Sequence, residues 1–147
     1  MELIVRKYGG TSVDSIDKIK KIALKTKNDI QNNNKILLVV SAMGKSTDDL
    51  LDQAKQISNS PDRRELDLLM SSGEIISSTL MSIALQEIGV KAKSLTGFQA
   101  GIDTNSRFGQ AEIQSINNSR IMNEIQNNNK TGETRGEEFR MALIRIW

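Results

Sequence analysis

The sequence predicts an α/β fold built on a mostly parallel sheet, and three observations support this prediction. A short apolar run occupies residues 3–5, and a second run, rich in branched side chains, occupies residues 36–40. Between them, isoleucines recur at helical spacing through residues 15–31. A strand–helix–strand unit of this length implies parallel strands joined by a right-handed crossover.

The first half of the chain divides into clear elements. We expect residues 2–7 to form a buried strand and residues 15–31 to form a helix, with Ser12 or Ser15 as its N-cap. The run at 36–40 is typical of strands buried in parallel sheets.

The middle of the chain is expected to be helical. Residues 47–58 have apolar side chains at helical spacing, and Pro61, the only proline, marks the next boundary. Residues 63–88 predict one or two helices, with Gly73 as a possible break and Gly89 as a C-cap.

The remaining elements are short. Residues 90–95 predict a strand, the Gly-, Thr- and Asn-rich residues 96–112 predict a loop, and residues 117–126 predict a helix.

One segment near the end of the chain echoes an earlier one. The sequence DIQNNNK at 29–35 returns as EIQNNNK at 124–130. An apolar run follows the first copy, but polar residues follow the second, so we expect no strand there. The apolar residues 139–147 predict either a short helix or an exposed tail.

Composition limits the chemistry. The 147 residues include neither Cys nor His, which excludes disulfides, thiolate catalysis, histidine bases and the usual zinc sites, and we expect no metal site. The net charge of +2 and an aromatic content of 3% give no support to nucleic-acid binding. Lysines, carboxylates, hydroxyls and backbone amides remain, and these groups suit phosphoryl transfer.

The expected location is the cytoplasm. No apolar run approaches the roughly 20 residues of a membrane span. The N-terminus lacks a signal-peptide pattern, because Arg6 and Lys7 interrupt a very short apolar run.

The sequence K-Y-G-G-T-S at residues 7–12 has the form of a phosphate-binding loop. It follows a predicted strand and leads into a helix. Glycines let the backbone approach a ligand closely, the helix N-terminus offers free amides, and Lys7 adds a mobile charge. An ordinary strand–turn–helix connection explains these six residues equally well.

Two further segments offer polar groups. Residues 41–47 follow the most apolar strand, which in an open α/β sheet is where ligands bind, although turn and cap roles explain them too. Gly44-Lys45-Ser46 is not the end of a P-loop, because Val39 occupies the place of the required glycine. Glu74 interrupts an apolar stretch and can either receive an ammonium group or lie at the surface.

Four segments, in this order, resemble the N-terminal half of the catalytic domain of aspartokinases. They are KYGGTSV at 7–13, VVSAMGKSTD at 39–48, GE at 73–74 and TGFQAGI at 96–102. The first is close to the family signature K-F-G-G-T-S, with Tyr8 in place of Phe. The resemblance covers residues 1–130 as half of one domain, with 131–147 as a divergent tail. It implies the three-layer α/β/α sandwich of amino-acid kinases, incomplete at its C-terminal side.

The resemblance implies phosphorylation of the L-aspartate side-chain carboxylate by ATP with Mg²⁺, the first step towards lysine, threonine and methionine and, in bacteria, diaminopimelate. Lys7 would be catalytic, stabilising the transferring phosphoryl group. The phosphate set would be Lys7, Gly9, Gly10, Thr11 and Ser12. The substrate set would be Ser41, Ala42, Thr47 and Glu74, with Glu74 receiving the α-ammonium. A carboxylate acceptor is already ionised at neutral pH, so no general base is needed.

The chain also departs from the family pattern. A strand ending in G-F-Q-G should follow residue 130, and the later G-R-G-G-S-D-T segment, T-D-P nucleotide site and ACT domains have no counterpart. We therefore expect a truncated aspartokinase with little or no activity alone. We also expect marginal stability or self-association through an exposed sheet edge or the apolar tail.

Two alternatives remain open. One is another amino-acid kinase, acting on glutamate or acetylglutamate, although residues 41–47 and Glu74 favour aspartate. The other is a non-catalytic interaction module, suggested by the apolar residues 139–147.

Overall fold

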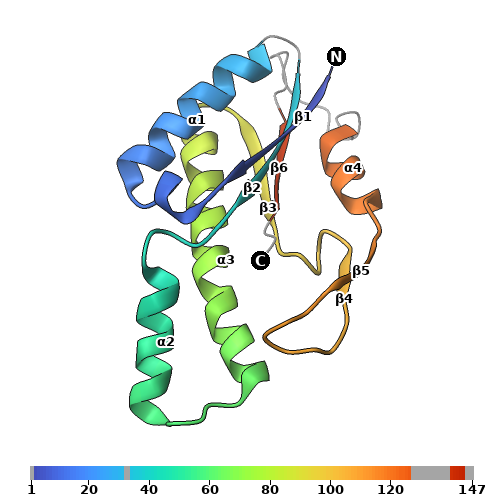
Figure 1. Cartoon of the computed structure of the whole chain (residues 1–147). Coiled ribbons are helices and arrows are strands. Elements are labelled where there is room, and N and C mark those ends of the chain that lie inside the picture. The colour runs from blue at the N-terminus through green and yellow to red at the C-terminus, as the bar shows by residue number, and fades with distance from the viewer. Residues whose placement is uncertain (1, 32–33, 127–139, 145–147) are drawn as a thin grey trace.

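The computed structural model describes residues 2–31, 34–126 and 140–144 (Figure 1). In chain order its elements are β1 (Leu3–Tyr8), the 3-10 turn η1 (Gly10–Ser12), α1 (Ile16–Gln31), β2 (Lys35–Val40), α2 (Ser46–Ile57), α3 (Arg63–Glu87), β3 (Lys91–Leu95), β4 (Ile102–Thr104), β5 (Ile113–Ile116), α4 (Ser119–Gln126) and β6 (Arg140–Ile144).

The main sheet has the strand order β1-β2-β6-β3, and every pairing in it is parallel. The predicted parallel pairing of the first two strands is confirmed, with Lys7 beside Val39 and Tyr8 beside Val40. Strands β4 and β5 form a separate antiparallel hairpin.

Helices cover both faces of the sheet, which confirms the three-layer prediction. Helices α1 and α3 lie on one face and α4 lies on the other (Figure 1). Alternation along β2 divides the core: Ile36, Leu38 and Val40 join the cluster under α1 and α3, whereas Leu37 and Val39 face the cluster under α4. Helix α2 packs against α3.

The prediction of a buried first strand is wrong. Leu3 and Val5 are 42% and 58% exposed. The cause is position, because β1 forms an edge of the described sheet and α1 covers only one of its faces.

Helix α3 is a single helix without a break at Gly73. Asp62 caps its start by accepting the Glu65 amide at 3.2 Å. Gly89 closes its other end with a φ of +83°, as predicted, and the Val90 amide returns to the Leu85 carbonyl at 2.9 Å.

Helix α3 is also the one helix in the described ranges that is long and apolar enough to span a membrane by length and composition. The expectation that no segment reaches that length therefore does not hold. The helix instead packs against α1, α2 and β3, with buried serines along its length. It is the central helix of this fold.

Most other predicted elements are confirmed, with α1, α2, β3 and α4 within a residue or two of their expected bounds. Ser15 caps α1, since its hydroxyl accepts the Lys18 amide at 3.3 Å.

Two predictions for the second half of the chain are wrong. The expected loop at 96–112 contains β4, a three-residue strand paired with β5 and too short for a periodicity signal. The segment after the second asparagine run contains β6, where a helix, an exposed tail or no strand was expected. Its backbone pairs with β2 on one side and β3 on the other, so the gap between those strands determines its conformation. The division of the chain at residue 130 stays a prediction.

Candidate functional site

Two loops meet where β1 and β2 end, because parallel strands bring their carboxyl ends to the same edge. The Ser41 amide donates to the Tyr8 carbonyl at 3.0 Å, and the Gly44 amide donates to the Gly10 carbonyl at 3.0 Å. The predicted phosphate loop and the predicted substrate loop are therefore joined through their backbones.

Gly10 makes this junction possible. A Cβ added there would lie 2.9 Å from the Ala42 carbonyl oxygen, closer than real Cβ atoms approach. A Cβ on Gly9 would meet nothing within 4 Å. The second glycine of the motif therefore serves close approach between two segments of this chain, whereas the first leaves space towards solvent.

The phosphate set surrounds this junction, and most of it is exposed. Lys7 lies near the end of β1, and its register partner Val39 belongs to the α4 face of the sheet. The Ser12 amide donates to the Gly9 carbonyl at 2.9 Å, so this amide is engaged inside the loop. The exposed hydroxyls of Thr11 and Ser12 remain at the surface.

A second lysine joins the loop, and sequence reasoning missed it. Lys18 Nζ donates to the Thr11 carbonyl at 2.9 Å and to Asp14 Oδ2 at 2.7 Å. The i,i+4 spacing of Asp14 and Lys18 was the available signal, although such pairs are common on helix surfaces.

The substrate set gathers where α3 crosses the β2–α2 loop. Ala42 is 5% exposed, and a Cβ on Gly73 would lie 3.2 Å from its side chain. The Ser77 hydroxyl donates to the Ser41 carbonyl at 2.7 Å. Glu74, partly buried, lies between these two contacts along α3.

Thr47 lies in the first turn of α2, where backbone amides face outward. The cap residue of this helix, Lys45, makes no side-chain cap bond. The neighbouring Ser46 hydroxyl is buried without a hydrogen-bond partner among the described residues. The positive end of the helix dipole lies here, and Asp48 and Asp49 of the same turn already face it with negative charge.

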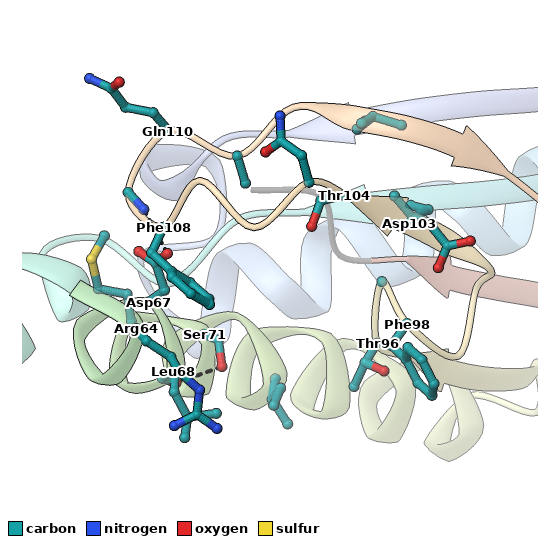
Figure 2. Close-up of a pocket in the computed structure, with 18 residues that line it drawn as sticks. Arg64, Asp67, Leu68, Ser71, Thr96, Phe98, Asp103, Thr104, Phe108 and Gln110 are labelled. Atoms are coloured by element: carbon teal, nitrogen blue, oxygen red, sulfur yellow. Dashed lines mark hydrogen bonds between the residues drawn. The ribbon is translucent and has the colours of Figure 1, made fainter. Parts of the chain in front are cut away.

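A cavity of about 860 Å³ lies beside this site, between the N-terminal half of α3 and residues 96–113 (Figure 2). Ser71 and Ile75, which flank Glu74 on α3, are part of its lining. Figure 2 shows Phe108 near Asp67 at one end and Phe98 near Thr96 at the other. Thr96 and Gly97, which directly follow β3, line the cavity, so it lies at the carboxyl end of that strand.

A buried carboxylate holds the cavity wall together. Asp67 is 9% exposed, and its Oδ2 accepts the Gly109 amide at 2.7 Å. This bond ties the β4–β5 hairpin to α3. No sequence signal identified Asp67, because its partner is 42 positions away in the chain.

A pKa shift is found away from this edge, at Arg6. Arg6 on β1 pairs with Asp29 on α1, and the hydrogen bond it donates there raises the pKa of Arg6, with partial burial opposing the shift. This pair supports the fold. Within the described ranges no three or more carboxylates converge as a metal site.

Known proteins resemble this chain closely. It is 50% identical over 121 residues to an aspartokinase of Geobacillus stearothermophilus, which covers 82% of this chain and 30% of that protein. It is 46% identical over 126 residues to aspartokinase 2 of Bacillus subtilis, covering 86% of this chain and 31% of that protein. The chain thus spans about a third of the length of these relatives.

Two solved structures, an aspartate kinase and an aspartokinase, have the same fold as this chain. Aspartate kinase from Synechocystis superposes with a TM-score of 0.74 at 40% identity, over 97% of this chain and 21% of that one. Aspartokinase III of E. coli, solved with aspartate and ADP, superposes with a TM-score of 0.67 at 20% identity, over 99% of this chain and 40% of that one.

The match to a family model is equally extensive. The model of the amino acid kinase family matches residues 2–131. That range includes the joined loops, α3 and the β4–β5 hairpin. The chain therefore belongs to the amino acid kinase family and resembles its aspartokinases.

Proposed function

We propose that this chain forms part of an ATP-dependent kinase that phosphorylates the side-chain carboxylate of L-aspartate. The observation that carries the proposal is the meeting of the β1–η1 loop, the β2–α2 loop and α3 at one sheet edge. At this edge the end of β1 with Lys7 and the glycine loop lie beside the start of α2 and the segment of α3 that contains Glu74. The 50% identity to an aspartokinase supports the choice of substrate.

The substrate set suits an amino acid with two carboxylates. The first turn of α2, with Ser41, Ala42 and Thr47 around it, supplies amides and hydroxyls for a carboxylate. Glu74, on α3, supplies the opposite charge for the α-ammonium. Glutamate, longer by one methylene, is the nearest competitor.

The phosphate set suits the transferring group. In the reaction, an oxygen of the aspartate carboxylate bonds to the γ-phosphorus, the bond to the bridging oxygen breaks, and ADP leaves. Lys7 places a positive charge near the negative charge that moves in this step. Gly9, Gly10 and Thr11 line the path with their backbone, and Ser12 offers its hydroxyl.

Mg²⁺ fits this site as a companion of the nucleotide. The described residues form no carboxylate cluster of their own, and Mg²⁺ is commonly bound through substrate phosphates with one or two carboxylates. When bound, it neutralises charge on the phosphates.

The chain spans about 30% of its aspartokinase relatives, so we expect little or no turnover by the chain alone. The reaction would open the route to lysine, threonine and methionine in the cytoplasm. Its ligands would be L-aspartate and ATP.

Binding to the purified 147-residue chain tests the proposal. L-Aspartate, succinate and L-glutamate are titrated by NMR into the wild type and into Glu74→Gln, with Glu65→Gln, an exposed change in the first turn of the same helix, as control. We expect aspartate to bind at least about tenfold more tightly than succinate, which lacks the ammonium, because a charged hydrogen bond contributes about 1.5–3 kcal/mol. Only Glu74→Gln should abolish this preference.

Two outcomes contradict the proposal. Equal affinity for succinate and aspartate in the wild type removes the role of Glu74, and preference for glutamate changes the substrate. A hydroxamate assay with ATP and aspartate adds a separate test, since robust turnover by the chain alone contradicts the expected lack of activity.

A further inference from the structure

Ser77 lies where α3 crosses the end of β2, and it makes a hydrogen bond between distant parts of the chain. Its hydroxyl donates to the Ser41 carbonyl at 2.7 Å, across 36 positions of sequence. The Glu74 carbonyl lies 3.0 Å away as a second acceptor. Ser77 is 1% exposed, so water does not compete for this bond.

The accepting carbonyl has special importance. Ser41 is the first residue after β2, where the chain leaves the ladder, and its amide still bonds to β1. Ser41 is partly buried, and a carbonyl withdrawn from water at such a point needs a partner, because an unpaired one costs the desolvation of the group. Ser77 supplies that partner from a different element.

A second contact lies one turn earlier on α3. Gly73 leaves room for Ala42 and Ser46, since a Cβ there would lie 3.2 Å from the Ala42 side chain and 3.4 Å from the Ser46 hydroxyl oxygen. Gly73 and Ser77 therefore fix α3 on the β2–α2 loop from both sides of Glu74.

We infer that Ser77 is a positioning residue that sets the separation between the carboxylate-binding loop at Ser41 and the ammonium-binding Glu74. The substrate part of this inference rests on the proposed function. The hydrogen bond fixes the register of the loop against α3, and so fixes which length of amino-acid side chain fits between the two groups. Thr47 follows this loop, in the first turn of α2.

Ser78 provides a matched control. It is also a buried serine of α3, at 4% exposure, but its hydroxyl donates at 3.0 Å to the Ile75 carbonyl within its own helix. Ser77→Ala and Ser78→Ala remove the same atom from adjacent positions. Only the first removes a bond to the substrate loop.

The experiment measures two quantities on the full 147-residue chain and on Ser77→Ala, Ser77→Thr and Ser78→Ala. Hydrogen exchange is followed at the Ser41, Gly44 and Ser46 amides, whose acceptors are Tyr8, Gly10 and Met43. The affinity for L-aspartate and for L-glutamate is measured by NMR titration.

We expect Ser77→Ala to accelerate exchange at these loop amides about tenfold, and to reduce the preference for aspartate over glutamate by a similar factor. Ser78→Ala should leave both quantities unchanged. Ser77→Thr keeps the hydroxyl, so the exchange rates and the aspartate preference should stay near their wild-type values. Threonine in a helix can still direct its hydroxyl to a carbonyl.

The outcomes separate this inference from the proposed function. Unchanged loop exchange in Ser77→Ala, or an equal change in Ser78→Ala, overturns the positioning role. A wild-type chain that binds no aspartate overturns the proposed function instead, and the exchange data then decide whether Ser77 fixes the loop. Faster exchange with an unchanged aspartate preference restricts Ser77 to the fold and overturns its role in specificity.

Discussion

The two faces of the main sheet differ in how completely they are covered. Under α1 and α3, helices of 16 and 25 residues bury a continuous cluster that includes Ile36, Leu38 and Val40. On the other face the eight-residue α4 covers a smaller cluster around Val39 and leaves Leu3 and Val5 exposed. Helix α4 packs against β6 (Figure 1), whereas β1 is the edge strand of the described sheet.

The difference separates the two halves of the proposed site. Glu74 and Ser77 come from α3, on the well-covered side, so the substrate set is held by buried contacts. Lys7 lies on the open side, and its side chain is exposed. The substrate half is thus held by buried side-chain contacts, whereas the phosphate half is held by backbone bonds and leaves the Lys7 side chain exposed.

The largest expected effect comes from the core of the covered face. Leu38 is 0% exposed, and Leu38→Ala should lower the free energy of unfolding by about 2–5 kcal/mol through lost burial and a cavity. Val5→Ala on the open face should change it by less than about 0.5 kcal/mol. Urea denaturation followed by circular dichroism measures both.

If Leu38→Ala does not fold, the milder variant Leu38→Val still allows the two faces to be compared. Leu38→Val should cost roughly 1 kcal/mol, still more than Val5→Ala. Similar losses at the two positions would show that the open face is covered in solution. Size-exclusion chromatography then distinguishes self-association, which stays a prediction, from a monomer.

An intermediate effect on stability is expected for the glycine pair Gly9 and Gly10, which lies at the boundary between the packed and open sides. Gly10→Ala places a Cβ 2.9 Å from a backbone oxygen and should destabilise the chain by about 1–3 kcal/mol. Gly9 has φ −74° and ψ 169° with open space around it, so Gly9→Ala should be neutral or stabilising by up to about 1 kcal/mol.

Thermal denaturation of the two variants checks this prediction, with aspartate titration as a second measurement. Gly10→Ala should also weaken aspartate binding, since it displaces the loop that contains Ala42. Equal behaviour of the two variants would contradict the assignment of close approach to Gly10 alone.

Local patterns in the sequence predict much of this fold for clear physical reasons. The apolar run in β2 and the isoleucines of α1 are recognisable because burial imposes a fixed periodicity on each element. The glycine loop and Glu74 were singled out from their residue types, the resemblance supplied their expected roles, and the structure places both at one edge of the sheet. Their roles stay predictions.

Features that depend on distant partners were not predictable in this way. Strand β6 forms because β2 and β3 leave a gap between them, which its own residues do not reveal. The bond between Ser77 and Ser41 and the bond between Asp67 and Gly109 each join segments that only the folded chain brings together. The exposure of β1 likewise depends on what covers a face, and not on its apolar residues.

The smallest expected effect on the free energy of unfolding comes from two ion pairs, one on each face of the sheet, that each join a strand to a helix. On the covered face Arg6 of β1 pairs with Asp29 of α1, and both side chains are 25% exposed. On the open face Lys93 of β3 pairs with Glu124 of α4 at 3.1 Å, and Lys93 is 56% exposed. Arg6→Gln should lower the free energy of unfolding by up to about 1 kcal/mol and Lys93→Gln by about 0–0.5 kcal/mol, because solvent screens the more exposed pair more strongly.

Salt and pH sharpen this last comparison. Raising the salt concentration from about 0.05 to 0.5 M should remove most of the Lys93 effect and less of the Arg6 effect. The hydrogen bond to Asp29 raises the pKa of Arg6, so its contribution is present below the unfolded pKa and is lost only as pH rises through the folded one. The cost of Arg6→Gln should therefore be constant between about pH 6 and pH 9. Equal salt sensitivity of the two variants would mean that the faces do not differ in solvent access at their strand–helix contacts, and that the contrast between them is confined to their apolar cores.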